Sequence, residues 1–277
     1  MIVAILAALS AATTPPPNST AAAPVDAAAI KSQLDEAQRA AEAGRLEQAR
    51  LMISKAIAAG ASQSDAGRAV ADLAFESAKY PEALALYKQL LVATPMDPLF
   101  LERAGISAFQ TGDMKLAASL IGRATALSGA SWRAWNARGA IADMDRDWAA
   151  ADAAYEKAGQ IAPDRAEIVN NRGWSRLLRG DWTRARDDFE RAAQLDPKST
   201  RIANNLELAR DALAVDLPRR LAGEPDHEWA ARLNDAGVAA QLLGDQKRAI
   251  AAFTQALETS GSWYQRAANN LEAARGR

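Results

Sequence analysis

The sequence predicts an all-α protein in which helix-turn-helix units stack into a solenoid. Two observations carry this prediction. Five alanines recur at a fixed interval of thirty-four residues: Ala49, Ala83, Ala117, Ala151 and Ala185. Hydrophobic residues make up 49% of the chain, and the residues at the small positions are good helix formers. Because a single globular core does not require a small residue at regular intervals, we expect a repeat array in which each unit contacts only its neighbours.

Each unit carries the same kinds of residue at the same places. The units begin at Ile30, Ser64, Pro98, Trp132 and Ala166. The eighth position is small in every unit: Ala37, Ala71, Gly105, Gly139 and Gly173. The twenty-fourth position is large: Ile53, Tyr87, Ile121, Tyr155 and Phe189. Small side chains at positions eight, twenty and twenty-seven let two helices approach closely, and the large residue fills the gap between them.

A turn is expected in the middle of each unit. Glycine stands at position fifteen in Gly44, Gly112 and Gly180, and aspartate follows at position sixteen in Asp113, Asp147 and Asp181. Glycine commonly ends a helix, and aspartate commonly caps the start of the next. Proline near position thirty-two, as in Pro95, Pro163 and Pro197, ends the second helix.

This pattern resembles the tetratricopeptide repeat, whose consensus has a small residue at position eight, Ala at twenty, a bulky ring at twenty-four and Pro at thirty-two. The best unit is NNRGWSRLLRGDWTRARDDFERAAQLDP, from Asn170 to Pro197, although Arg172 and Arg176 stand where the family prefers apolar residues. The resemblance implies a right-handed tetratricopeptide α-solenoid whose first helices line a concave groove. A protein or peptide partner is expected in that groove.

The period also predicts the organisation of the chain. We expect five repeats and a sixth first helix over residues 30–213, an irregular insert at 214–229, and a final repeat with a C-terminal capping helix over 230–277. The insert either bends the array or forms a short irregular cover. The capping helix would cover the apolar end of the stack.

The first 29 residues are predicted to lie outside the solenoid. Residues 1–12 are expected to be a signal peptide, because an apolar segment from Ile2 to Leu9 leads into small residues and is too short to span a bilayer. No Lys or Arg precedes Lys31, so a misassigned start codon and a plain disordered tail stay open as alternatives. Residues 13–29 are expected to form a disordered Pro/Ala/Thr linker, because proline and small residues supply too little apolar surface to offset chain entropy. The expected location is periplasmic or otherwise exported, with a cytoplasmic location as the alternative.

Asparagines at position five are the main candidates for partner binding. They are Asn136, Asn170, Asn204, Asn234 and Asn269, and further asparagines follow at Asn171, Asn205 and Asn270. A carboxamide both donates and accepts hydrogen bonds, so a row of them could pair with the backbone of an extended peptide. The row resembles the asparagine ladder in the repeat domain of the protein sugar transferases. Alternatively, these asparagines support the turn or the neighbouring helix.

Three further residues are expected in the groove: Arg133, Trp174 and Arg201. Trp174 at position nine could equally pack on the adjacent helix. The first units lack the converging Lys and Asn residues with which some repeat proteins hold the free carboxylate of a chaperone tail, so that class of partner is not expected.

Charge and composition exclude several other functions. The chain has 33 Lys and Arg, 34 Asp and Glu, and no long run of either sign, so nucleic acid is not an expected partner. Without cysteine there is no disulfide, thiolate metal site or cysteine nucleophile. His227, the only histidine, is expected in an exposed loop, and Asp187 and Asp188 are expected to be solvated on the outer side of a second helix. We expect no catalytic residue, metal, cofactor or small-molecule substrate, and so no enzyme activity.

The favoured hypothesis is therefore a protein-binding adaptor of the bacterial cell envelope. The stretches VNNRGWSRLLRGDW and RIANNLELA resemble repeat proteins of bacterial tight-adherence pilus assembly, although those relatives are typically lipoproteins and this chain has no cysteine to carry the lipid. Two alternatives stay open, namely a self-associating structural module and a regulatory subunit of a larger complex.

Overall fold

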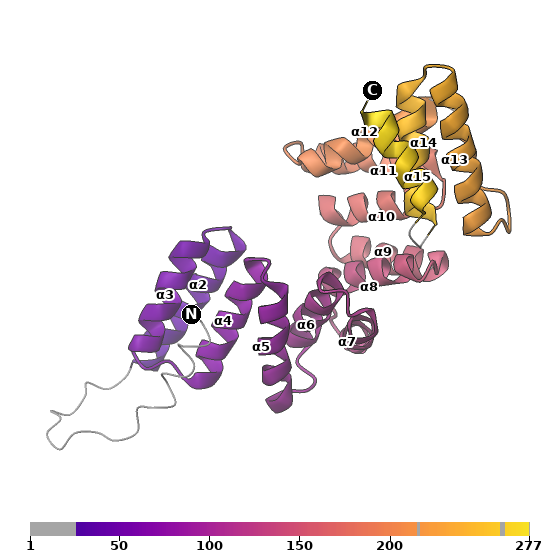
Figure 1. Ribbon diagram of the computed structural model, residues 1–277. Helices are drawn as coiled ribbons and strands as arrows, with labels where there is room; N and C mark the ends of the chain where they lie inside the picture. Colours follow the sequence, from indigo (N-terminus) through magenta and orange to yellow (C-terminus); the bar gives the residue numbers. More distant parts are fainter. Residues whose placement is uncertain (1–25, 215–216, 261–263, 277) are drawn as a thin grey trace, which may run out of the picture. The chain divides into compact units, whose positions relative to one another are not determined.

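The computed structural model describes residues 26–214, 217–260 and 264–276, and these residues form α-helices and no strands (Figure 1). The predicted signal peptide and residues 13–25 of the predicted linker lie outside the described residues. The chain divides into two compact units, residues 1–93 and residues 94–277. None of the described helices is both long enough and apolar enough to cross a bilayer.

Unit 1 contains two helical pairs. Its helices are α2 (Ala27–Glu42), α3 (Leu46–Ala58), α4 (Gln63–Glu76) and α5 (Tyr80–Ala93). Helix α2 begins at Ala27, inside the segment expected to be disordered, rather than at Ile30. The Asp26 carboxylate explains this, because it accepts hydrogen bonds from the backbone N–H groups of Ala28 and Ala29 and so caps the helix.

Unit 2 contains the remaining helices. The first seven are α6 (Pro98–Gln110), α7 (Met114–Ala126), α8 (Trp132–Met144), α9 (Trp148–Ile161), α10 (Ala166–Leu178), α11 (Trp182–Leu195) and α12 (Thr200–Ala214). The last three are α13 (Asp226–Leu242), α14 (Gln246–Thr259) and α15 (Gln265–Arg275). In both units, consecutive helices pack as antiparallel pairs joined by short turns.

Within a pair, the small residue at position eight lies against the large residue at position twenty-four. A Cβ atom added to Gly139 would be 2.7 Å from the Tyr155 ring, and one added to Gly173 would be 2.8 Å from the Phe189 ring. Both rings are almost completely buried. The sequence prediction of close helix approach at these positions is confirmed, since no side chain larger than hydrogen fits without displacing a ring.

The turn at position fifteen requires a left-handed backbone conformation. Gly44, Gly112 and Gly180 have φ angles of 74°, 82° and 78°. Where glycine is absent, Ala78 and Arg146 adopt φ angles of 55° and 58° at the same position. This region costs a non-glycine residue about 1–2 kcal/mol, so the turn geometry is imposed by the packing of the two helices.

The irregular insert is shorter than the sequence predicted. Helix α12 continues to Ala214 and α13 begins at Asp226, rather than at Ala230. Pro225 precedes the helix, and Asp226 and Glu228 place negative charge in its first turn, where the helix dipole favours it. Trp229 is completely buried and donates a hydrogen bond from Nε1 to the Pro218 carbonyl at 3.2 Å. This anchored indole ties the start of α13 to the preceding loop.

The last repeat also contacts helices far from it in the sequence. Gln255 on α14 donates from Nε2 to the Leu177 carbonyl on α10 at 3.3 Å. The Arg146 guanidinium donates to the Thr259 carbonyl at 2.6 Å and pairs with Asp226. Helices α10 to α15 share one hydrophobic cluster. In the C-terminal unit, therefore, α13 and α14 fold back on earlier repeats instead of contacting only their nearest neighbour.

Candidate functional site

The position-five asparagines divide into two groups. Asn136 on α8, Asn170 on α10 and Asn234 on α13 are buried, with 6%, 2% and 1% of their surface exposed. Asn204 on α12 and Asn269 on α15 are exposed. The position of an asparagine within its repeat therefore does not determine whether its carboxamide reaches solvent.

The buried carboxamides bond to asparagines of the next first helix. Asn171 donates from Nδ2 to the Asn136 Oδ1 at 3.2 Å, and Asn205 donates in the same way to Asn170 at 2.9 Å. Asn170 in turn donates to the Asn171 Oδ1 at 3.2 Å. These bonds form one continuous amide chain across α8, α10 and α12.

The same pairing recurs at the end of the chain, where Asn270 on α15 donates to the Asn234 Oδ1 on α13 at 2.9 Å. A buried carboxamide without a partner is costly, so each pair favours one register between adjacent first helices. These bonds correspond to the alternative in which the asparagines support a neighbouring helix. They leave Asn204 and Asn269 as the position-five carboxamides that solvent can reach.

The other predicted groove residues lie on α8, α10 and α12. We call the surface formed by positions two, five, six and nine of these three helices the first-helix face. Arg133 and Arg201, both at position two, are exposed on it. Trp174 at position nine is half-buried and packs against the hydrophobic cluster of the C-terminal helices. Part of this indole therefore contributes to packing, and part reaches the surface.

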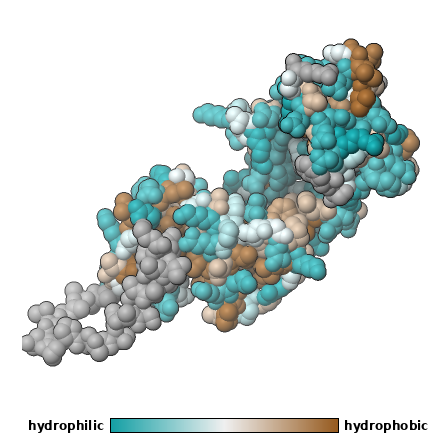
Figure 2. Space-filling view, viewed as in Figure 1, coloured by the Kyte–Doolittle hydropathy of each residue, from teal (hydrophilic) through white to brown (hydrophobic). Residues whose placement is uncertain are grey.

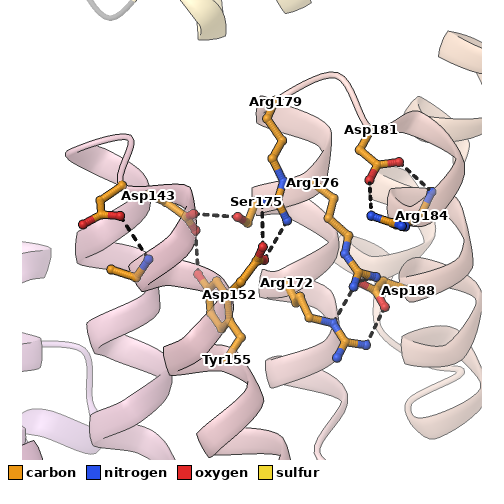
Figure 3. A network of polar contacts seen from close by, with 12 residues as sticks. Asp143, Asp152, Tyr155, Arg172, Ser175, Arg176, Arg179, Asp181, Arg184 and Asp188 are labelled. Carbon is orange, nitrogen blue, oxygen red and sulfur yellow. Dashed lines mark hydrogen bonds and ion pairs between the residues drawn. The ribbon is translucent and has the colours of Figure 1, made fainter. Parts of the chain in front are cut away.

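A buried polar network links α8, α9 and α10 (Figure 3). Asp143 accepts hydrogen bonds from Tyr155 at 2.7 Å and from Ser175 at 2.6 Å. Burial raises the pKa of the Asp143 carboxyl to about 6, although both hydroxyls oppose the shift by stabilising the charged form. The sequence carries no periodic signal for this network, because Asp143 and Tyr155 stand at different positions of one repeat and Ser175 belongs to the next.

The two arginines that depart from the repeat consensus have a common partner. Arg172 and Arg176 pair with opposite oxygens of the Asp188 carboxylate, at 2.7 and 2.6 Å (Figure 3). Asp188 is only 4% exposed, so the prediction that it is a solvated surface charge was wrong. The reason is that Asp188 faces α10 within its own repeat, whereas the neighbouring Asp187 faces solvent. An ion-pair cluster thus takes the place of apolar packing in this repeat.

Unit 1 has an open hollow of about 100 Å³ between α2 and α4. Charged residues of both signs line it, and they pair with each other: Lys31 lies 3.5 Å from Asp35, and Arg68 lies 3.7 Å from Asp72. The Asp72 carboxylate also accepts a hydrogen bond from Tyr87 at 2.6 Å. These internal pairs reduce the charge that the hollow can offer to a charged ligand.

An exposed apolar area lies at the turn between α13 and α14. Leu242 and Leu243 expose 84% and 81% of their surface, and Val238 adds to the same helix end. Figure 2 shows this area as a strongly hydrophobic patch at the outer end of the C-terminal helices. Adjacent leucines with this exposure are unfavourable in water unless a partner covers them.

The described residues offer little for catalysis. His227 lies in the first turn of α13, rather than in a loop, and its side chain is 80% exposed. Among the described residues, no group of three His, Cys, Asp or Glu side chains is arranged to hold a metal ion. The buried acids described above are engaged by hydroxyl or guanidinium groups.

The chain has three features typical of one kind of repeat. Its helices form antiparallel pairs, the turn at position fifteen has a left-handed backbone, and a small residue packs against a ring. Models of the tetratricopeptide repeat match residues 34–98, 68–130 and 166–199. This chain is a tetratricopeptide repeat protein. Among curated protein sequences, none matches it.

Solved structures share the tetratricopeptide fold at low sequence identity. A thermophilic tetratricopeptide protein of Thermus thermophilus is 17% identical, with a TM-score of 0.56, over 65% of this chain and 98% of that one. PilF of Pseudomonas aeruginosa is 14% identical, with a TM-score of 0.51, over 90% and 97%. PilW, a type IV pilus biogenesis factor, is 13% identical, with a TM-score of 0.51, over 87% and 97%. These similarities establish the solenoid architecture.

Proposed function

We propose that this tetratricopeptide protein is a non-enzymatic scaffold that binds a peptide or protein partner on its first-helix face. The observation that carries this proposal is the amide chain across α8, α10 and α12, which holds three first helices in one register. A rigid face loses little conformational freedom when a partner binds, so more of the contact energy is available for affinity.

In this proposal the asparagines have two roles. Asn136, Asn170 and Asn234 hold neighbouring helices together, while the exposed Asn204 contacts the partner. The Asn204 carboxamide can both donate to and accept from a peptide backbone. Arg201, one turn away on the same helix, adds a positive charge for an acidic group of the partner.

A crosslinking pull-down from native cells tests this proposal. The full-length chain and the double variant Arg201→Ala/Asn204→Ala would be crosslinked in cells and purified, and the recovered proteins quantified by mass spectrometry. We expect the variant to recover at least tenfold less of the main partner. Both residues are exposed, so circular dichroism should show an unchanged helix content.

A matched control comes from α11, which is the second helix of its repeat. Arg184 is exposed and Arg186 is partly exposed on α11, and the double variant Arg184→Ala/Arg186→Ala should recover the partner at the wild-type level. Equal recovery by all three proteins would show that the first-helix face of α12 does not bind the partner.

The proposal also includes a location in the cell envelope and a role in pilus assembly. Sequence stretches that resemble tight-adherence pilus proteins support them, and the PilF and PilW structures have the same solenoid fold. Cell fractionation with an epitope at the C-terminus tests the location. Recovery in the cytoplasm alone would contradict export, and a pull-down without pilus assembly proteins would contradict the pilus role.

A second candidate function is self-association through the α13–α14 turn. The observation in its favour is the exposure of Leu242 and Leu243. Light scattering over a dilution series should then show dimers that dissociate in the variant Leu242→Glu/Leu243→Glu. A monomer at every concentration would rule this function out while leaving partner binding intact.

A further inference from the structure

Two arginines share one tryptophan ring beside the start of α8. The guanidinium carbon of Arg133 lies 4.6 Å from the centre of the Trp132 ring, and that of Arg165 lies 5.3 Å from the same centre. Arg133 belongs to α8, and Arg165 directly precedes α10. The two positive charges, from the beginning and the end of one repeat, therefore lie within about 10 Å of each other.

These two arginines differ from the others near them. Within the part of the chain that the structure describes, neither guanidinium has a hydrogen bond or an ion pair. Both side chains are exposed, while the indole beneath them is half-buried and so limits their freedom. Cation–π contact with the ring offsets part of the repulsion between the two charges. The arrangement therefore holds two exposed guanidiniums without a direct ion pair, and the charge of Arg133 also acts on the buried Glu102 carboxyl.

Three acids in this part of the chain each have a hydrogen-bond or ion-pair partner other than Arg133 and Arg165. Glu102 is buried and bonds to the Ser131 hydroxyl, at the cap of α8. Asp164 lies 3.5 Å from Arg191, and Glu167 accepts from the Asn136 carboxamide at 3.5 Å. These contacts leave both guanidiniums without a direct carboxylate partner. The negative charge of the three acids disfavours a compact polyanion such as a polyphosphate more than an extended peptide whose carboxylates are spaced apart.

We propose that Arg133, Arg165 and Trp132 form a binding site for a carboxylate of an acidic peptide segment. Guanidinium groups pair with carboxylates through parallel N–H···O bonds, and the exposed part of the indole can contact an apolar side chain next to the acid. This inference rests on the proposed function, because it names the chemistry of the partner that the first-helix face would bind.

Titration of the full-length chain with a blocked hexaglutamate peptide tests the site, with binding followed by calorimetry at low salt. Hexaglutamine serves as the uncharged peptide, and inorganic tripolyphosphate as an anion without a peptide. We expect hexaglutamate to bind and the other two to bind at least tenfold more weakly. Tighter binding of tripolyphosphate than of hexaglutamate would overturn the choice of a peptide carboxylate.

Two variants separate the site from general surface charge. Arg133→Gln/Arg165→Gln should weaken hexaglutamate binding at least tenfold, and Trp132→Leu, which keeps both charges, should weaken it about threefold or more. The control Arg184→Gln removes an exposed arginine from α11 and should stay within twofold of wild type. Equal losses in the control and the double variant, or no loss in the double variant, would overturn the proposal.

Failure of the proposed carboxylate site can be distinguished from failure of the proposed function. Arg201 and Asn204 lie on α12, outside the site, so the pull-down with their double variant reports on the face alone. Loss of the cellular partner from that variant, together with unchanged hexaglutamate binding by Arg133→Gln/Arg165→Gln, would support the proposed function and reject the carboxylate site.

Discussion

At the scale of single residues, the chain places several groups in unfavourable states that neighbouring repeats stabilise. Asp143 is a carboxylate that is only 7% exposed, and Ala78 and Arg146 hold a backbone conformation that suits glycine. None of these states is favourable for the isolated residue. They persist because helix packing determines the local geometry.

The Asp143 carboxyl should make stability depend on pH. Its pKa is about 6 in the folded chain against 3.8 for the ordinary value, so the folded state binds the proton more tightly. This group's contribution is therefore most favourable below pH 4 and is lost as pH rises to 6, by on the order of 3 kcal/mol. Asp143→Asn should remove that part of the pH dependence, as measured by urea unfolding at pH 4.5, 5.5, 6.5 and 7.5.

Asp152→Asn is the control, because the pKa of Asp152 is shifted in the opposite direction to that of Asp143. The hydrogen bonds from Arg179 lower the pKa of Asp152, so its contribution is present at neutral pH and is lost as pH falls. If Asp143→Asn and the wild type show parallel stability curves between pH 4.5 and 6.5, the buried carboxyl does not titrate as described.

Ala78→Gly should stabilise unit 1 by about 1 kcal/mol, because glycine adopts the φ angle of 55° without a steric clash. Thermal unfolding followed by circular dichroism measures the change. Ala59→Gly, at a helix end with a φ angle of −80°, should be neutral or destabilising. A loss of stability in Ala78→Gly would mean that the alanine methyl group contributes packing that outweighs the backbone term.

At the scale of helices, two devices hold the repeats together. A glycine opposite a ring sets the distance within a pair, and the amide chain sets the register between first helices. The distance within a pair follows from the size of the two residues in contact. The register follows from the need of each buried amide for a hydrogen-bond partner. A change at either place should affect stability more than the same change at an exposed position.

Gly139→Ala tests the contact within a pair. The new methyl group would lie 2.7 Å from the Tyr155 ring, so we expect a loss of about 1–3 kcal/mol in chemical denaturation. Gly122→Ala adds the same methyl group in open space on α7 and should stabilise by about 0.5–1 kcal/mol. Similar effects of both substitutions would show that Tyr155 can move aside at no cost.

Asn170→Ala tests the amide chain. It leaves Nδ2 of Asn205 and Oδ1 of Asn171 without their partner, and we expect a loss of about 1–3 kcal/mol. Asn204→Ala, at the same repeat position but exposed, should change stability by less than about 0.5 kcal/mol. Urea unfolding of both variants provides the comparison, and equal effects would argue against the structural role of Asn170.

At the scale of the whole molecule, the regular array ends within unit 2, where α14 folds back on α10 and α12 and the turn after α8 contacts both α13 and α14. Arg146 is central to this contact, since it joins the turn after α8 to Thr259 and Asp226. The contact joins segments more than a hundred residues apart in the chain, so it depends on the complete C-terminal unit.

Arg146→Gly should therefore loosen the last repeat. Glycine suits the backbone at this position, so the expected effect comes from the lost hydrogen bond and ion pair. Hydrogen exchange should accelerate in residues 226–259 and stay unchanged in residues 46–93, as measured by mass spectrometry. Unchanged exchange in α13 and α14 would show that the buried indole of Trp229 and its hydrophobic cluster hold the repeat without Arg146.

The repeat architecture was predictable from sequence because it depends on residue size and backbone freedom at fixed intervals. Positions eight, fifteen and twenty-four carry those signals directly, as Gly139, Gly112 and Tyr155 show. The candidate site was less predictable. Asn170 and Asn204 occupy the same position in adjacent repeats, yet one is buried against the next helix and the other is exposed.

By itself, the sequence determined the tetratricopeptide solenoid, its helix pairs and the helices on which the candidate residues lie, since these follow from local periodicity. Only the tertiary structure decided which asparagines hold the repeats together, that Asp188 neutralises two arginines, and that the last repeat folds back on α10. Each of these depends on contacts between residues far apart in the chain. A thirty-four-residue period specifies the repeating unit, whereas those contacts depend on the individual side chains at positions where the repeats differ.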